Sequence, residues 1–436
     1  MNFEEENDEL GRSFLERMYF DEWKKDEEDR SANRSTLELD SRFDCNLDCK
    51  YCYVAKYGDE LYPDVDDRTL YENAEKVMEW LIENGMNPGL ELFAGEPLVQ
   101  DVNFEILDMI FRKFEGVEKA PSKIVIPTNF TWIKSDKYLE KVEELMVKSR
   151  EKGMPVYLSA SIDGKYCADN RPPIKFTEED YEKIFEFAKE WQCGFHPMVY
   201  SEEIENWKKN WRWFQEKFEE YDMPFNQIYL LEVRNREWSK EQINEFGEFL
   251  KWLIDWTVEK VGKERLLDFI FNDGYNILSH SFCTVGRGIG CSIQSTVFLR
   301  LADMGIGPCH RLSYDQFMLA ELKEKDASPD GDDATADLGV EVHRPELLIG
   351  HTAFDNEYQP MCEKCTINKL CTGQCLGAMY EETGDMFSPI PNVCRLEYKK
   401  VTSLIEKFRE IGLLEKLKLR VNDAKEVQIE NLEEII

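Results

Sequence analysis

The chain has 436 residues, 42 % of them hydrophobic, which is enough to bury the core of one large α/β domain and a smaller one. It lacks any run of 18 apolar residues and starts with an acidic segment, so we expect a cytoplasmic protein without a membrane-spanning helix or a signal peptide. Its 54 basic and 88 acidic residues give a net charge of −34, which argues against nucleic acids and anionic membranes as partners, because a polyanion repels both.

Short apolar runs alternate with longer amphipathic runs from Thr36 onward, after a charged segment that has a helical pattern around residues 11–23. The apolar runs predict strands at 36–43, 90–93, 123–128, 156–162, 194–200 and 227–233. The amphipathic runs predict helices at 67–84, 103–115, 136–152, 177–191, 203–221 and 241–261. This alternation is typical of a parallel sheet with right-handed crossovers, either open or curled into a partial barrel. In such sheets, functional residues gather at the carboxyl ends of the strands.

The regular alternation ends near Gly274, and most of the cysteines lie beyond it. Residues 326–343 are rich in acidic residues and predict a solvated loop, whereas residues 396–417 have a helical period. We therefore expect four parts: an acidic helical segment at 1–35, an α/β domain at 36–273, a cysteine-rich domain at 274–395, and a helix with an acidic tail at 396–436.

Thirteen cysteines in a cytosolic chain indicate metal or redox chemistry, because disulfides are disfavoured in that compartment. Cys45, Cys49 and Cys52 directly follow the first predicted strand. Three thiolates can hold three irons of a 4Fe–4S cluster and leave the fourth iron open to a ligand. A zinc knuckle with a distant fourth ligand is the alternative that the spacing by itself leaves open.

The spacing Cys45-x3-Cys49-x2-Cys52, with Tyr51 before the third cysteine, resembles the signature of the radical S-adenosylmethionine superfamily. The resemblance extends from residue 36 to about residue 235. It implies that the amino and carboxylate groups of S-adenosylmethionine bind the open iron, and that Tyr51 belongs to the cofactor site. It also implies that an electron from the cluster cleaves the sulfonium to methionine and a 5′-deoxyadenosyl radical, which takes a hydrogen atom from a substrate.

Three further strand ends carry residues that match this superfamily. Ala94-Gly95-Glu96-Pro97 resembles its Gly-Gly-Glu-Pro turn, with alanine in place of the first glycine, and implies that Glu96 accepts hydrogen bonds from the amino group of the cofactor. Thr128-Asn129 stands where the superfamily has Thr-Asn-Gly-Thr, and Phe130 replaces the glycine. Taken one at a time, these are also ordinary turn residues.

The fourth predicted strand ends in Ser161 and Asp163, and Arg171 follows in the next loop. The resemblance implies that the serine and the arginine contact the ribose and the carboxylate of the cofactor. A guanidinium suits a carboxylate because it is a planar double donor. The alternative for each residue is an ordinary loop position.

The distal cysteines are spaced Cys362-x2-Cys365-x5-Cys371-x3-Cys375 and are followed by Cys394. With the upstream Cys283, Cys291 and Cys309 they make eight ligands, which is the number that two fully protein-ligated 4Fe–4S clusters require; two zinc ribbons are the alternative.

The distal pattern resembles the SPASM extension of radical S-adenosylmethionine enzymes that modify peptides, although Met304 stands where that family has a glycine. The resemblance implies a first auxiliary cluster on Cys283, Cys291, Cys309 and Cys375. It implies a second on Cys362, Cys365, Cys371 and Cys394. The expected fold is a partial (β/α)6 TIM barrel followed by a cysteine-rich SPASM domain, with three 4Fe–4S clusters and S-adenosylmethionine as cofactors.

SPASM enzymes mostly act on peptides or proteins, so we expect a peptide substrate, with a leader, and a flavodoxin or ferredoxin-type electron donor. In sulfatase maturases, an Asp that serves as the catalytic base directly follows the cysteine equivalent to Cys309. Here His310 and then Arg311 follow Cys309, and both are candidate catalytic residues. Residues 194–200 and 207–214 resemble maturases that form thioethers in cysteine-rich peptides, although the aromatic residues of the second segment also fit a packed helix face.

Several other reactions are possible alternatives. Oxidation of Cys or Ser to formylglycine, carbon–carbon crosslinking and epimerisation are alternatives within the same family. A non-catalytic electron carrier or zinc-rich adaptor is an alternative of a different class. Only 44 residues precede Cys45, so we expect a peptide-recognition domain to be either missing or supplied by a separate protein. Cys167 and Cys193 fit no cluster and are either buried or in contact with the substrate.

Overall fold

The computed structural model describes residues 15, 20–26, 36–93, 95–283, 296–324, 338–343, 360–371, 373–425 and 428–432. Of the N-terminal segment it describes little beyond the short helix α2 (Asp21–Lys24), so most of the helix expected around residues 11–23 lies outside the described residues. Within the described part of the chain, no helix combines the length and the apolar character that crossing a membrane requires.

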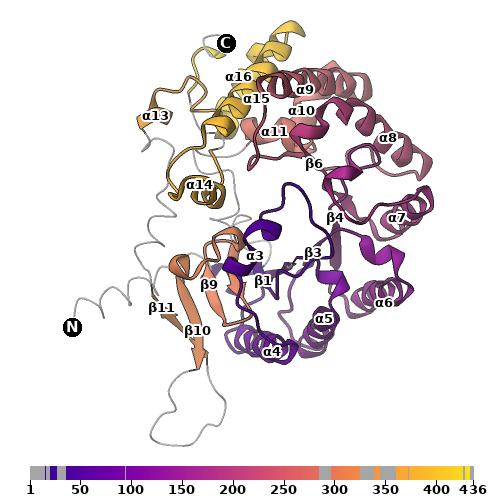
Figure 1. The fold of residues 1–436 in the computed structure, drawn as a ribbon, viewed down its shortest axis with the longest axis vertical. Coiled ribbons are helices and arrows are strands. Elements are labelled where there is room, and N and C mark those ends of the chain that lie inside the picture. The colour runs from indigo at the N-terminus through magenta and orange to yellow at the C-terminus, as the bar shows by residue number, and fades with distance from the viewer. Residues whose placement is uncertain are drawn as a thin grey trace, which may run out of the picture.

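Five parallel strands neighbour one another in sequence order in the larger sheet (Figure 1). They are β1 (Thr36–Asp40), β2 (Gly89–Phe93), β3 (Ile124–Thr128), β4 (Val156–Ala160) and β5 (Gly194–Phe195). A bridge between Phe195 and Ile228 and the parallel pair β6 (Met198–Val199) and β7 (Leu231–Glu232) continue this arrangement. All six predicted strand positions therefore pair in parallel, and the expected partial barrel is confirmed.

The fifth predicted strand, 194–200, is split into β5 and β6 at His196-Pro197. Proline has no backbone N–H to donate to a neighbouring strand, which explains the break. The backbone N–H of His196 still donates to the carbonyl of Ala160 at 2.7 Å, so the chain stays beside β4 through the break.

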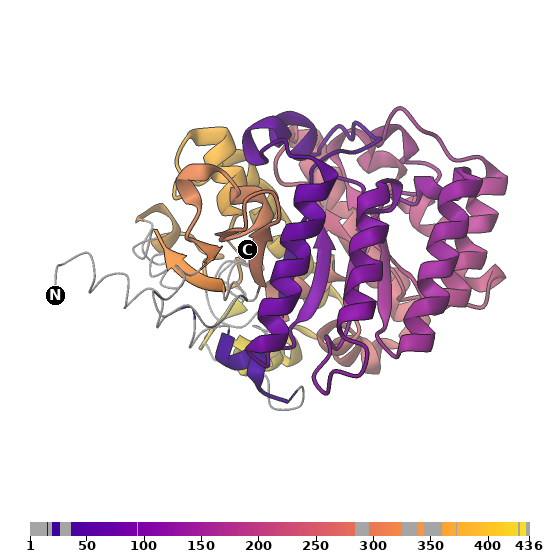
Figure 2. The same ribbon diagram turned by 90° about the horizontal axis from the view of Figure 1, so that it is seen from below.

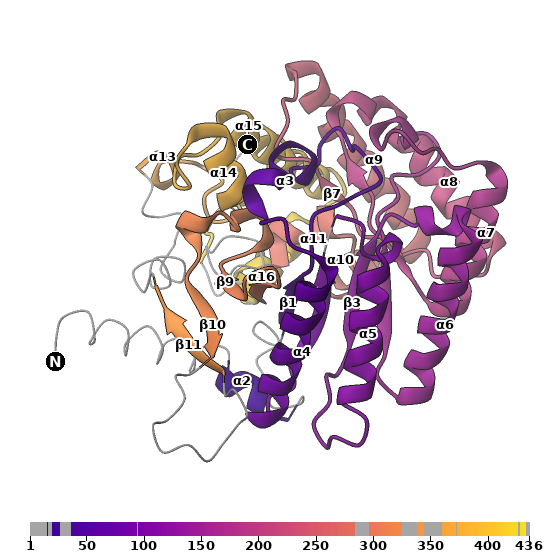
Figure 3. The ribbon, with the colours of Figure 1, turned by 60° about the horizontal axis from the view of Figure 1, so that its bottom comes forward.

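Helices follow the strands and cover the outer face of the sheet. They are α4 (Asp67–Glu83), α5 (Asp101–Lys113), α6 (Asp136–Lys152), α7 (Glu178–Trp191), α8 (Trp207–Glu220) and α9 (Lys240–Val261). Figures 2 and 3 show α4, α5 and α6 side by side. Side-chain caps fix several helix starts: Asp66 accepts from the N–H of Thr69, and Thr177 and Ser239 each begin a capping box.

The alternation of side chains along β1 and β2 separates two faces. Leu37, Leu39, Leu90 and Leu92 are all buried and lie on one face, where the helices cover the sheet. Glu38 pairs in register with Glu91, so these acidic side chains share the other face, toward the interior of the barrel.

The sheet also extends beyond β1, which the sequence did not predict. β8 (Thr296–Arg300) pairs in parallel with β1, and β9 (Gly305–Gly307), β10 (Ala320–Glu324) and β11 (Leu338–Val342) follow in antiparallel order. Strands therefore continue beyond Gly274, where the regular strand–helix alternation was expected to end, and the assignment of residues 338–342 to an acidic loop is wrong. These strands have only three to five residues each, so each offers little of the apolar pattern by which a strand is predicted.

The C-terminal helix packs back on the barrel, as Figure 1 shows for α15 (Pro391–Glu410) against α9. This helix crosses the expected boundary at residue 396 and contains Cys394. The single helix expected at 396–417 is in fact two, because Gly412, with φ of +68°, separates α15 from α16 (Leu414–Lys425). The cysteine-rich part and the C-terminal part thus share one helix.

Candidate active site at the carboxyl ends of the strands

Cys45, Cys49 and Cys52 lie in the loop between β1 and α3 (Val54–Leu61). Main-chain hydrogen bonds hold this loop: the N–H groups of Asp48 and Lys50 donate to the carbonyls of Pro172 and Asn170, at 2.7 and 3.0 Å. Burial raises the pKa of Cys45 to about 12 and that of Cys49 to about 11. Both thiols must therefore lose a proton when they bind iron, and three thiols from one loop fit a cluster with one open iron.

Gly95 brings the turn after β2 against this loop. Its N–H donates to the carbonyl of Arg42 at 3.1 Å, and the N–H of Glu96 donates to the carbonyl of Asp44 at 2.9 Å. A Cβ atom at position 95 would lie 2.2 Å from the carbonyl oxygen of Asp44, so only glycine fits here. Pro97 begins a short 3₁₀ helix, whereas Ala94 lies outside the described residues.

Glu96 is buried and accepts three hydrogen bonds. Its Oε1 accepts from the hydroxyl of Thr128 at 2.6 Å and from the N–H of Leu98 at 3.1 Å, and its Oε2 accepts from the N–H of Asn129 at 2.5 Å. Burial raises its pKa to about 7, against the lowering effect of these donors. Because the described residues give Glu96 no ion-pair partner, its carboxylate can take up a cationic ligand.

Asn129 connects the end of β3 to the cysteine loop. Its Nδ2 donates to Oδ1 of Asn46 at 2.9 Å and lies 3.8 Å from the sulfur of Cys45. Phe130, which replaces the glycine of the resembling motif, has φ of +62° in the left-handed region. Its ring is fully buried, with its centroid 4.8 Å from that of Trp132, and this packing compensates for the strained backbone.

Asp163, after β4, organises the opposite side of the cysteine loop. It accepts a hydrogen bond from the hydroxyl of Tyr51 at 2.6 Å and from the N–H of Met198 at 2.9 Å, and it forms an ion pair with Arg171 at 3.0 Å. Nη1 of Arg171 lies 4.0 Å from the sulfur of Cys49, and its Nε is buried without a hydrogen-bond partner among the described residues. This unused donor can serve a carboxylate ligand.

Ser161 contributes through its backbone, since its N–H donates to the carbonyl of Thr128 at 2.8 Å. The structure therefore brings the predicted residues of four successive strand ends to one edge of the sheet: the cysteine loop, Glu96, Asn129 and Asp163.

His310 approaches the same region from the cysteine-rich part of the chain. Its Nδ1 lies 2.5 Å from Oε1 of Glu38, and its ring stacks on Phe93 with centroids 4.4 Å apart. Burial lowers the pKa of His310, but the Glu38 carboxylate more than offsets this, and the pKa lies above its ordinary value. Sequence reasoning missed Glu38; an acidic residue between two leucines of a buried strand is the signal that could have revealed it.

Glu38 has acidic neighbours on the same face of the sheet. Glu91 lies beside it in register, and burial raises the pKa of Glu91 to about 7. Burial also raises the pKa of Asp40, whose two carboxylate oxygens have no hydrogen-bond partner among the described residues. The barrel interior next to His310 is therefore rich in buried carboxyl groups.

Arg311, the next residue, is engaged in an ion pair. Its Nε donates to Oε1 of Glu381 at 2.8 Å, and its Nη2 pairs with the second oxygen of the same carboxylate. Glu381 belongs to α14 (Leu376–Thr383), which begins just after Cys375. Because its guanidinium is engaged in this buried ion pair, we infer that Arg311 positions α14 and is not a catalytic residue.

Four of the distal cysteines line one cavity of about 140 Å³: Cys362, Cys365, Cys371 and Cys394. Nε2 of Gln374 donates to the sulfur of Cys394 at 3.0 Å, and the N–H of Gly373 donates to the sulfur of Cys371 at 3.4 Å. These are the four residues that the resemblance implies for the second auxiliary cluster. Four thiols suit a fully ligated 4Fe–4S cluster, and they also suit zinc.

The other proposed ligand set is described only in part. Cys309 packs against an apolar cluster that includes Leu376, the residue that follows Cys375 at the start of α14. The side chain of Cys283 and the whole of Cys291 lie outside the described residues.

Two other groups of residues singled out from the sequence are buried in the core. Cys167 and Cys193 are 0 % and 1 % exposed. Trp207, Trp211 and Phe214 of α8 are fully buried as well, so they form a packed helix face.

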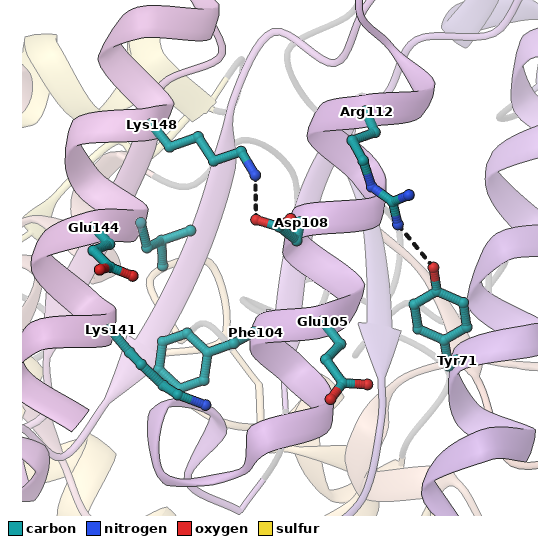
Figure 4. Close-up of a pocket in the computed structure, with 9 residues that line it drawn as sticks. Tyr71, Phe104, Glu105, Asp108, Arg112, Lys141, Glu144 and Lys148 are labelled. Carbon is teal, nitrogen blue, oxygen red and sulfur yellow. Dashed lines mark hydrogen bonds and ion pairs between the residues drawn. The ribbon is translucent and has the colours of Figure 1, made fainter. Parts of the chain in front are cut away.

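A cavity of about 530 Å³ lies away from the strand ends, on the outer surface along α4, α5 and α6 (Figure 4). Several of its polar side chains pair with one another: Lys148 pairs with Asp108, and Nη2 of Arg112 donates to the hydroxyl of Tyr71 at 3.0 Å. We therefore do not consider this cavity a candidate active site.

Comparisons with known proteins agree with this geometry. Residues 42–180 match the family model described as a 4Fe-4S single cluster domain. A search of the curated proteins found no match. Native anSMEcpe with bound AdoMet is 17 % identical with a TM-score of 0.56, over 89 % of this chain and 100 % of that chain. The same protein with bound AdoMet and Cp18Cys peptide is 17 % identical with a TM-score of 0.53, over 89 % and 100 %.

Streptococcus suis SuiB bound to S-adenosylmethionine is 12 % identical with a TM-score of 0.46, over 82 % of this chain and 77 % of that chain. At 17 % identity the likeness to anSMEcpe concerns the fold. The chain has the α/β fold of the radical S-adenosylmethionine enzymes, with a large parallel sheet and a cysteine-rich C-terminal region.

Proposed function

We propose that this protein is a radical S-adenosylmethionine enzyme that modifies a peptide. The observation that carries the proposal is the convergence of a three-cysteine loop, an unpaired buried carboxylate and an arginine with an unused donor at one edge of the sheet. A zinc-rich adaptor or an electron carrier would leave Glu96 and Arg171 without a role.

In this proposal each group of the site has a distinct task. Cys45, Cys49 and Cys52 would hold the cluster, and with bound S-adenosylmethionine this group supplies a 5′-deoxyadenosyl radical. Glu96 would accept hydrogen bonds from the ammonium of the cofactor, and Arg171 would donate to its carboxylate. Asp163 would keep Arg171 and Tyr51 in place.

The peptide substrate is supported by the shared fold with anSMEcpe, which was solved with a bound peptide. We further propose that the modification is a thioether link from a cysteine sulfur to a carbon atom. Such a link requires loss of one hydrogen atom from carbon, one proton from the thiol and one electron from the resulting radical. His310, beside Glu38, would accept the proton, and the cluster proposed at the four-cysteine cavity is the candidate acceptor of the electron.

Iron analysis and cofactor cleavage test the general proposal. After anaerobic reconstitution, three 4Fe–4S clusters predict about 12 irons per chain, and dithionite should then drive formation of 5′-deoxyadenosine and methionine. The Cys49→Ala variant should lose this cleavage. Stoichiometric zinc with little iron would refute the proposal, and iron without cleavage would leave the electron-carrier alternative.

Mass spectrometry of a cysteine-rich peptide tests the thioether. We expect loss of two hydrogens for each link and protection of the linked cysteine from alkylation. An aldehyde at a former Cys or Ser would identify formylglycine formation instead. A link without a protected cysteine would indicate carbon–carbon crosslinking, and incorporation of solvent deuterium at unchanged composition would indicate epimerisation. We propose a flavodoxin or ferredoxin-type donor and a separate peptide-recognition protein as partners; turnover with such a donor in place of dithionite would test the first.

A further inference from the structure

A buried ionic network borders the four-cysteine cavity. Glu397 of α15 lines the cavity, and its Oε1 lies 3.2 Å from Nη2 of Arg234. Glu232 of β7 pairs with Arg234 at 2.5 Å and with Nζ of Lys400 at 2.9 Å. The exposed fractions of these side chains are 2 % for Glu397, 16 % for Arg234 and 0 % for both Glu232 and Lys400. The network therefore holds two acidic and two basic groups in a nearly dry environment.

This network acts electrostatically on a proposed cluster ligand. Glu397 lines the cavity together with Cys371, and the guanidinium of Arg234 lies 3.2 Å from the carboxylate of Glu397. The two charges therefore affect a negative sulfur in opposite directions. Interactions of this kind are screened little by salt when the groups are buried.

The segment that carries Arg234 also holds the loop of the first cluster. Nδ2 of Asn235 donates to the carbonyl of Tyr51, and Nε of Arg236 donates to the carbonyl of Lys50, both at 2.9 Å. Val233 packs in one cluster with Tyr51, next to Cys49. Residues 232–236 thus contact both the three-cysteine loop and the border of the four-cysteine cavity.

Stability alone does not explain four buried charges at this place. Well-packed apolar side chains of similar size are often equally or more stabilising than a buried ion pair, because burying charge has a desolvation cost. Charges beside four cysteines can affect a bound cluster, because net charge and hydrogen bonds around a cluster set its reduction potential.

We propose, on the basis of the function proposed above, that Arg234 and Glu397 are positioning residues that set the reduction potential of a cluster held by Cys362, Cys365, Cys371 and Cys394. Reduction adds a negative charge to the cluster. The guanidinium of Arg234 favours the added electron and raises the potential, whereas the carboxylate of Glu397 opposes the electron and lowers the potential. Gln374 supports the same cluster by donating to the sulfur of Cys394.

Variants of the full-length, anaerobically reconstituted protein test this proposal in a redox titration followed by electron paramagnetic resonance. The relevant signal is the one that Cys365→Ser abolishes. Glu397→Gln should raise the midpoint potential of that signal, and Arg234→Met should lower it. Arg234→Lys keeps the charge and should leave the potential close to that of the unmodified protein. Glu406→Gln is the matched control, because Glu406 lies on the same helix and pairs with Lys251 at 2.6 Å in a half-exposed position.

The outcomes distinguish failure of this proposal from failure of the cluster assignment. Unmoved potentials, or shifts of the same sign in Glu397→Gln and Arg234→Met, would overturn the proposal while the cluster itself stands. Absence of a Cys365-dependent signal from the unmodified protein would overturn the cluster assignment and this proposal together. If Arg234→Met does not take up iron, Glu397→Gln still decides: a raised potential supports the proposal and an unmoved one overturns it.

Discussion

Glu96 offers a direct test of the proposed cofactor site, because its carboxylate is buried and has no ion-pair partner within the described residues. Its pKa is raised to about 7 by burial, so the neutral acid prevails below that pH and the carboxylate above it. The carboxylate is the form that binds the ammonium of S-adenosylmethionine. Affinity for the cofactor should therefore rise as the pH rises through about 7.

The size of the effect follows from the fraction of carboxylate. A group with a pKa of about 7 is about one-tenth ionised at about pH 6 and about nine-tenths ionised at about pH 8, so the apparent affinity should increase about tenfold over this range. Glu96→Gln removes a charge-assisted hydrogen bond of about 1.5–3 kcal/mol, which corresponds to about 10- to 150-fold weaker binding at about pH 8.

Equilibrium dialysis with labelled S-adenosylmethionine measures both effects on reconstituted protein. The Glu96→Gln variant should also lose most of the pH dependence, which separates Glu96 from the titration of the cofactor itself. Glu105→Gln, at an exposed position on α5, is the control, and thermal unfolding shows whether each variant is folded. A Glu96→Gln variant that is folded, loaded with iron and binds the cofactor as the unmodified protein does would refute the assignment.

Three further predictions concern neighbouring residues. Gly95→Ala places a methyl group 2.2 Å from the carbonyl oxygen of Asp44. This variant should have a lower iron content, and its free energy of unfolding should fall by about 1–3 kcal/mol. Gly58→Ala is the control, because its methyl group has room and should change neither quantity. Phe130→Gly relieves the strain of the left-handed backbone but leaves a cavity in the core. Denaturant titration should therefore show that the free energy of unfolding falls by about 2–4 kcal/mol. A gain in stability would show that the packing of the ring does not compensate for the strain. Glu38→Gln should reduce peptide modification about tenfold or more, while 5′-deoxyadenosine formation continues. An equal fall in modified peptide and in 5′-deoxyadenosine would exclude a role for Glu38 through His310.

The sequence by itself determined the local features of this protein. The spacing of Cys45, Cys49 and Cys52 is a property of one loop, and the turn at Glu96 and the asparagine at 129 each follow a strand whose apolar pattern is visible in the chain. Because parallel strands end at the same edge of a sheet, the order of strands was enough to bring these loops together. The boundaries of α4 and α6, predicted at 67–84 and 136–152, also followed from helical periodicity.

Tertiary structure decided the contacts between distant segments. β8 lies beside β1 although 255 residues separate Asp40 from Thr296, and the pairing of His310 with Glu38 depends on that approach. The ion pair with Glu381 likewise showed how Arg311 is used. Such contacts arise when packing brings together side chains that have no fixed spacing along the chain, so no local pattern could have predicted them.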